Sequence, residues 1–311
     1  MLETNKTVVK EFILFAFADL QQIQNLLVFV FLLNYILCIL GNMAIIIIIR
    51  VDPSLHTVMY FFIGVFSVLE IMLVTVIVPK LLANVISGNN IISFTECFTQ
   101  MYIFISSGST ECYLLAVMAF DRHLAINNPL HYQAIMTPAF YISLAVLPWI
   151  MAFSIILAPV ITTAQLDYCG PNVIDHFYCD VAPLQNLACS DVFISNIATL
   201  IASMLIIILA FITIIGFYIQ IIMTVSRIKS KEGKQKAFST CSSHLIIAGL
   251  FYGTGTIVYV KPKGGHYDKY LTFMYTVITP MSNPFIYTFR NRDIKKAFRN
   301  LINNLIKPVQ M

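Results

Sequence analysis

Charged side chains are scarce in this sequence, and their scarcity excludes a soluble globular protein. Only 11% of its 311 residues are Asp, Glu, Lys or Arg, and 59% are hydrophobic, whereas about a quarter of the residues in a soluble domain are charged. Internal repeats and low-complexity segments are also lacking. The net charge of +4 requires no nucleic-acid partner, because the basic residues flank apolar runs, where anionic lipid and membrane topology account for them.

Seven apolar runs are long enough to cross a lipid bilayer, whose hydrocarbon core of about 30 Å requires about 20 helical residues. Backbone polar groups in lipid must be hydrogen-bonded within the chain, which favours helices. The sequence therefore predicts an all-α membrane protein, a seven-transmembrane helix bundle. The expected spans are 24–49, 57–86, 97–121, 139–162, 193–226, 238–260 and 269–289.

The distribution of Lys and Arg predicts the orientation of the bundle. Thirteen of these 19 residues fall on one face of the predicted membrane and six on the other, and the richer face is normally cytoplasmic. We therefore expect a multi-pass plasma-membrane protein with its amino terminus outside. No cleavable signal peptide is evident, so the first span would direct insertion. The expected parts are an extracellular tail (1–23), the seven-transmembrane domain (24–289) and a cytoplasmic amphipathic helix with its tail (290–311).

An Asp-Arg pair closes the third apolar run, inside the string MAFDRHLAINNPLHY that ends at Tyr132. A charged pair costs several kcal/mol at the centre of a bilayer, so it belongs at the membrane edge. An ordinary Arg at a helix end would mark only the cytoplasmic face. The whole string, however, resembles the sequence after transmembrane helix 3 of vertebrate olfactory receptors, which are rhodopsin-like G-protein-coupled receptors. Phe120, His123 and Asn127 stand where that family usually has Tyr, Tyr and Cys.

Three further strings resemble the same family, in the same order and at the expected membrane faces. Lys236–Leu245 is very close to KAFSTCxSHL, and Pro280–Lys295 is similar to PMLNPFIYSLRNKDVK with Ser282 in place of Leu. Pro53–Phe62 is similar to PLHTPMYFF, with Val58 in place of Pro. The resemblance implies a receptor, not an enzyme, that binds a small-molecule odorant within the bundle. It also implies a heterotrimeric G protein of the stimulatory type as partner, and a rise in cAMP.

The resemblance places an odorant pocket against helices 3, 5 and 6. Its helix 3 residues recur at spacings of three and four and share one face, although such a stripe alone would more often indicate helix packing. This wall carries hydroxyls and no fixed charge, and a buried charged ligand would need a counter-ion. We therefore expect small neutral volatile ligands, not acids or amines, with Tyr259 as the orienting group. The expected pocket residues are Phe104, Ile105, Gly108, Ser109, Cys112, Thr199, Ala202, Ser203, Ile206, Tyr252, Thr256 and Tyr259.

A second group of residues is expected to carry the signal to the G protein. Arg122 would couple to it, with Asp121 restraining that Arg at rest. A Pro inside helix 7 frees a carbonyl and permits a kink, and residues 290–306 have the spacing of an amphipathic helix on the inner leaflet. The expected switch residues are Asp121, Arg122, Tyr218, Asn283, Pro284 and Tyr287.

Glu70 and Glu111 are the two acidic residues deep within predicted spans, where ionisable groups are usually functional. Together they could hold a sodium ion between helices, the single cofactor that we consider. Alternatively one or both are protonated and hydrogen-bonded, because burial disfavours the charged carboxylate. The sequence leaves both interpretations open, a bound sodium ion and a protonated carboxyl group. Near the amino terminus, Asn5 begins a glycan acceptor pattern, Asn-Lys-Thr, which is credible on the extracellular side.

Four cysteines fall on the oxidising side of the membrane, namely Cys97, Cys169, Cys179 and Cys189. Four cysteines allow three pairings. The family resemblance selects Cys97 with Cys179, and Cys169 with Cys189, which would fasten a loop of unusual length as a lid.

Three other interpretations of the sequence are weaker than that of a receptor. His176, Cys179 and Asp180 could suggest a transition-metal site, but a disulfide at Cys179 would leave two scattered ligands. A transporter or channel would usually show repeated halves and charged residues in several spans. An enzyme would need spaced catalytic partners, which Cys241 and His244 lack in the sequence.

Overall fold

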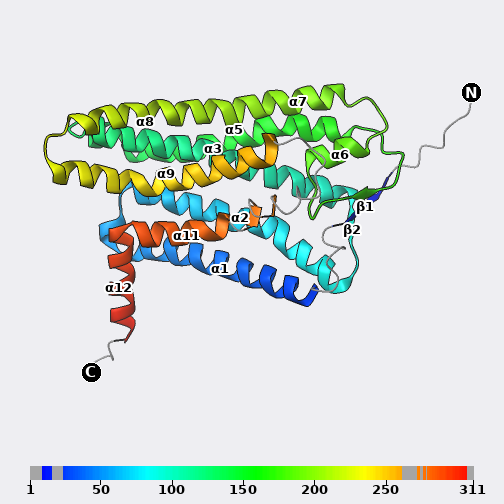
Figure 1. Ribbon diagram of the computed structural model, residues 1–311, viewed down its shortest axis with the longest axis horizontal. Coiled ribbons are helices and arrows are strands. Elements are labelled where there is room, and N and C mark those ends of the chain that lie inside the picture. Colours follow the sequence, from blue (N-terminus) through cyan, green and yellow to red (C-terminus); the bar gives the residue numbers. More distant parts are fainter. Residues whose placement is uncertain (1–8, 16–23, 261–271, 274–275, 278, 307–311) are drawn as a thin grey trace, which may run out of the picture.

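The computed structural model of the protein describes residues 9–15, 24–260, 272–273, 276–277 and 279–306. Its long helices run side by side (Figure 1). The helices that form the bundle are α1 (Gln24–Val51), α2 (Val58–Ser87), α3 (Phe94–Asn127), α5 (Pro138–Ala164), α7 (Phe193–Ser203) continued by the π-helical η3 (Met204–Ile208) and α8 (Leu209–Arg227), α9 (Lys231–Val260) and α11 (Thr279–Arg290). The shorter elements are η2 (Pro53–Leu55), α4 (Tyr132–Ile135), α6 (Val181–Leu187) and α12 (Arg292–Ile306).

Each expected span corresponds to a helix of this bundle, and the predicted seven-helix architecture is present. Within the described residues, five helices are long and apolar enough to cross a membrane: Gln24–Val51, Val58–Ser87, Phe94–Asn127, Pro138–Ala164 and Phe193–Arg227. The other two positions are filled by α9, which packs on α3, α8 and α11, and by α11, which packs on α1, α2 and α9.

A small sheet at one end of the bundle accompanies the predicted helices. Strand β1 (Glu11–Leu14) lies between β2 (Ile91–Ser93), to which it is antiparallel, and β3 (Val173–Ile174), to which it is parallel. The Phe12 side chain is fully buried, with its ring against those of Phe94 and Tyr168. Burial of this ring and pairing on both edges stabilise a strand that is too short to persist alone.

Two helices extend beyond their predicted ends. Helix α3 begins at Phe94 because Ser93 and Glu96 form a capping box, in which each side chain accepts a hydrogen bond from the other residue's backbone N–H. It continues to Asn127, so the Asp-Arg pair lies within the helix and not at its end. Helix α9 begins at Lys231 instead of residue 238, because the Lys, Glu and Gln residues of the expected connection are good helix formers.

Helix α3 is the central element of the fold, in contact with α2, α5, α8 and α9. Helix α12 lies at the end of the bundle opposite the sheet and runs crosswise to the long helices (Figure 1). It buries Ile294 and Ala297 on one face, and the Tyr60 hydroxyl of α2 donates to Asn291 and Asp293, at 3.0 Å each. The fold therefore fixes one end of α3 beneath the sheet, in contact with β1 and β2.

Candidate functional site

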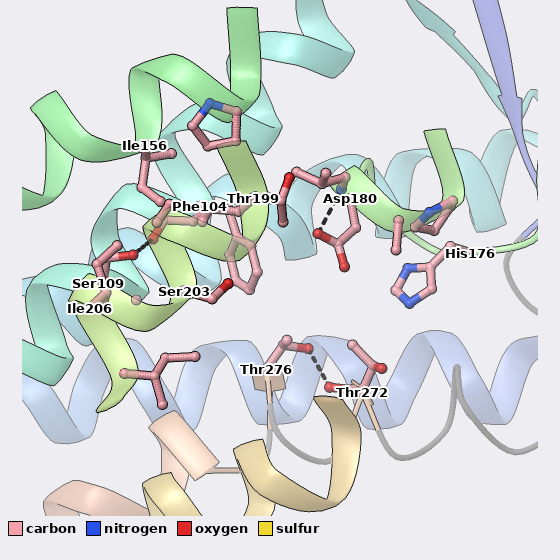
Figure 2. Close-up of a pocket in the computed structure, with 18 of the residues that line it drawn as sticks. Phe104, Ser109, Ile156, His176, Asp180, Thr199, Ser203, Ile206, Thr272 and Thr276 are labelled. Atoms are coloured by element: carbon pink, nitrogen blue, oxygen red, sulfur yellow. Dashed lines mark hydrogen bonds between the residues drawn. The ribbon is translucent and has the colours of Figure 1, made fainter. Parts of the chain in front are cut away.

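A cavity of about 910 Å³ lies beneath the loop that contains β3 and α6. Its walls come from α2, α3, α5, α7, η3, α9 and α11, together with Thr272 and Thr276. Figure 2 shows Thr199 and Ser203 on one side with Thr272 and Thr276 on the other. Its size is typical of small-molecule sites. Nine of the twelve expected pocket residues line it: Phe104, Ile105, Gly108, Ser109, Cys112, Thr199, Ala202, Ser203 and Ile206.

The expected contribution of helix 6 needs correction. Tyr252 is not among the residues that line the cavity; its hydroxyl donates to the Cys112 carbonyl at 3.3 Å and its ring packs against Phe211. Its neighbour Phe251 faces the cavity instead. Successive residues of a helix point about 100° apart. An error of one residue in which side of the helix faces the cavity therefore selects Tyr252 instead of Phe251. The side chains of Thr256 and Tyr259 lie outside the described residues.

Three hydroxyls of the cavity are already bonded to carbonyl groups of their own helices. Ser109, Thr199 and Thr276 donate to the carbonyl four residues earlier, at 2.7, 2.8 and 2.8 Å. Each has a single proton, so these groups face a ligand only as acceptors. Within the described part of the chain, the Ser203 hydroxyl makes no hydrogen bond, and Figure 2 shows it directed into the cavity.

Acidic side chains also line the cavity, which contradicts the expectation of a wall without charge. Asp175 and Asp180 lie at the loop end, and Glu70 and Glu111 at the deep end. No Lys or Arg is found among the described lining residues. From the sequence, Glu70 and Glu111 were considered apart from the pocket, because their place in it depends on how α2 and α3 are rotated. The basis for excluding amines is therefore wrong.

The deep end holds several oxygen atoms without partners. Glu70 and Glu111 are 1% and 3% exposed, and the Asn283 amide donates to one Glu70 oxygen. The second Glu70 oxygen, one Glu111 oxygen and the Asn283 carbonyl oxygen have no hydrogen bond among the described residues. Buried oxygens of this kind normally have a partner, and hard cations take oxygen ligands. The set fits a sodium ion, which stays a prediction.

Both expected cysteine pairs are joined. Cys97 at the start of α3 is bonded to Cys179 in the loop, and Cys169 to Cys189 within that loop. The Cys179 backbone N–H also donates to the Gln100 side chain, at 3.1 Å. With its thiol in a disulfide, Cys179 cannot bind a metal ion as a thiolate. The described residues contain no cluster of three or more His, Cys, Asp or Glu side chains that could hold a metal ion.

Near the carboxyl-terminal end of α3, Arg122 is paired with Asp121 within a buried site. The Arg122 Nε lies 2.8 Å from an Asp121 oxygen, and the two residues are 9% and 1% exposed. The other Asp121 oxygen accepts a 2.6 Å hydrogen bond from the Tyr132 hydroxyl. Both carboxylate oxygens are thus occupied, and the guanidinium is held against its own helix.

A polar chain joins helices 3, 5 and 6 beside this pair. The His244 Nε2 lies 3.0 Å from the Leu115 carbonyl, to which it can only donate. His244 Nδ1, 2.6 Å from the Tyr218 hydroxyl, therefore accepts its proton. His244 is 4% exposed and Tyr218 6%. From the sequence, Tyr218 was expected to be a switch residue. His244 was not, although it lies in the KAFSTCSSHL string.

Comparison with known proteins decides the family. A model of the olfactory receptor family matches residues 31–304. The chain belongs to the olfactory receptor family. It is 45% identical to human olfactory receptor 11H4 over 95% of this chain and 92% of that protein. It is 40% identical to human olfactory receptor 6C4, over 97% and 99% of the two chains, and 42% identical to human olfactory receptor 1L1, over 98% and 85%.

The protein is therefore an odorant-sensing G-protein-coupled receptor with several membrane-crossing helices. In this olfactory receptor the expected switch residues belong to α3 (Asp121 and Arg122), α8 (Tyr218) and α11 (Asn283, Pro284 and Tyr287). Pro284 packs on α1 at Gly41, where an added Cβ would lie 3.0 Å from the Pro284 Cβ. The Tyr287 side chain and the glycan acceptor Asn5 lie outside the described residues.

Proposed function

We propose that this receptor binds small neutral odorants in the cavity and activates a stimulatory heterotrimeric G protein, which raises cAMP. One observation carries the proposal: α3 lines the cavity at Ser109 and holds the buried Asp121–Arg122 pair at its other end. Arg122 is 13 residues beyond Ser109, about 20 Å along a helix. The receptor would act at the plasma membrane with its amino terminus outside, in keeping with the Lys and Arg distribution.

The lining of the cavity disfavours acids and offers apolar contacts to a neutral odorant. A carboxylate would face four acidic side chains without a described Lys or Arg to pair with it, and an unpaired buried charge is costly. Contacts with Phe104, Ile156 and Ile206 would supply mostly apolar burial, with few hydrogen bonds for orientation. Affinity should be modest, because small ligands offer few atoms.

Coupling would be a shift between two packings of the bundle. The Asp121–Arg122 pair, the Tyr132 hydroxyl and the Tyr218–His244 bond together hold the resting arrangement. Outward movement of α9 would break the bond between helices 5 and 6, release Arg122 and open a cleft for the G protein. A ligand favours that state only as far as it binds it more tightly.

The deep acids would serve as a separate control point. We propose that Glu70 and Glu111, with the Asn283 carbonyl, hold a sodium ion. Bound there, sodium would neutralise carboxylate charge beside helix 7. The unpartnered oxygens of these three residues support the proposal.

A cAMP reporter in transfected cells tests the receptor assignment. With an odorant that activates the parent receptor, Arg122→Ala should abolish the cAMP response at unchanged surface expression. Arg299→Ala, on the exposed face of α12, is the matched control and should respond like the parent. An undiminished response of Arg122→Ala would refute the coupling role.

A further inference from the structure

Gln185 links the extracellular loop to helix 5 at the edge of the cavity. It lies on α6, and its amide nitrogen faces two hydroxyls of α7, those of Ser195 at 2.8 Å and Thr199 at 3.3 Å. Gln185 is 9% exposed and Ser195 1% exposed. Of these three residues, Gln185 and Thr199 line the cavity and Ser195 does not.

Neighbouring groups determine which atoms donate. Thr163 donates its one proton to the Pro159 carbonyl at 2.7 Å, so Ser195, at 2.8 Å from the Thr163 oxygen, must donate to it. The Ser195 oxygen is then an acceptor. Thr199 donates to the Ser195 carbonyl and is likewise left as an acceptor. Only the NH₂ group of Gln185 can satisfy both oxygens, which fixes the orientation of its amide.

The two Gln185 N–H groups are held unequally. The bond to buried Ser195 has the usual N–O length, whereas the bond to Thr199 is longer than the common range for an N–H donor. Thr199 is only half-buried and sits at the cavity wall. The weaker bond is therefore the one that a ligand can reach and replace, while Ser195 keeps the amide in place.

We propose that Gln185 recognises an acceptor oxygen of the odorant, through the N–H that Thr199 holds weakly. The inference rests on the proposed ligand cavity and narrows its ligand class to neutral molecules with a carbonyl or ether oxygen. Such a ligand exchanges a bond between the loop and helix 5 for a bond to itself, without leaving a buried donor unpaired. Binding thereby frees Thr199 from the loop while α6 stays fastened through Ser195.

Two substitutions with opposite expected effects test the proposal. The probes are medium-chain ketones and the alkanes of the same length, and the readout is stabilisation of the purified receptor against heat, titrated to give apparent affinity. Gln185→Leu should weaken ketone binding by about two- to tenfold and leave alkane binding nearly unchanged. Thr199→Val, which removes the competing acceptor at similar size, should strengthen ketone binding by about two- to fivefold.

A purely structural role for Gln185 predicts a different pattern. Loosening the loop would weaken ketones and alkanes alike in both variants. The melting temperature of each variant without ligand shows whether it folds. If Gln185→Leu fails to fold, the Thr199→Val result alone decides the proposal. Gln165→Leu, at an exposed position away from the cavity, is the matched control and should keep the parent's preference for ketones.

Other results overturn the inference as well. It is wrong if ketones and alkanes bind the parent receptor equally, if neither stabilises it, or if Thr199→Val weakens ketone binding as much as Gln185→Leu. The cAMP assay separates this outcome from the receptor assignment. A ketone that binds through Gln185 without raising cAMP counts against G-protein coupling alone, whereas a ketone response unaffected by Gln185→Leu counts against the inference alone.

Discussion

Breaking the Tyr218–His244 hydrogen bond should raise the activity of the receptor without ligand. Tyr218→Phe removes the hydroxyl that donates to His244 at 2.6 Å, and leaves a ring nitrogen of His244 without its donor in a buried site. A lost bond with a buried unsatisfied partner costs about 1 to 3 kcal/mol. The bond belongs to the arrangement in which Asp121 and Arg122 are paired, so the cost falls on the resting state.

The expected size of the effect follows from that cost. About 1.4 kcal/mol changes an equilibrium constant tenfold. If about 1% of the parent receptors are active without ligand, a typical population for a minor state, about 10% of the variant would be. Basal cAMP in transfected cells should therefore rise several-fold at equal surface expression.

Two comparisons sharpen this test. Tyr35→Phe removes a hydroxyl bonded to Thr75 at 3.3 Å, on an exposed part of α1, and basal cAMP should not change. His244→Phe breaks the same bond as Tyr218→Phe, so the double variant should be far from additive. Basal cAMP that stays level or falls in Tyr218→Phe would refute the assignment of this bond to the resting state.

Two further predictions concern the deep acids and the contact between helices 1 and 7. Replacing sodium by choline at constant ionic strength should lower the melting temperature of the purified receptor, and Glu111→Gln should melt equally in both salts; a parent receptor indifferent to the exchange would rule out bound sodium. Gly41→Ala should melt below Gly64→Ala, because an added Cβ would lie 3.0 Å from the Pro284 ring at Gly41 but 3.9 Å from the mobile end of Ile49 at Gly64. Equal melting of the two variants would contradict the close contact.

The features of the receptor that could be predicted were those that a short stretch of sequence determines. Apolar runs defined the helices, and the spacing on helix 3 selected residues that do line the cavity. The strand β1 could not be foreseen, because Phe12 pairs with Ile92, and Ile13 with Val173, far along the chain. Whether Glu70 and Glu111 face the cavity likewise depends on how α2 and α3 are rotated, which no single stretch of sequence records.

The departures from the usual family string become intelligible only in the structure. His123 and Asn127 stand where Tyr and Cys are usual, and they are one helical turn apart on α3. The Asn127 amide nitrogen lies 3.1 Å from His123 Nδ1, and the His123 ring packs against Phe217 of α8. The two unusual residues thus partner each other, so changing one back to the family residue alone would remove a partner of the other.

The contacts of Tyr252, which was expected in the cavity, show how the cavity is connected to the switch residues. Tyr252 and His244 lie two turns apart on α9, and they bond to the carbonyls of Cys112 and Leu115, neighbouring turns of α3. Cys112 lines the cavity, and so does Phe251 beside Tyr252. A ligand wedged between these two residues would press directly on the contact that holds α9 to α3. The bond to Leu115 shares His244 with Tyr218, so a displacement at Cys112 need travel only about one turn of α3 before it reaches the resting-state bond.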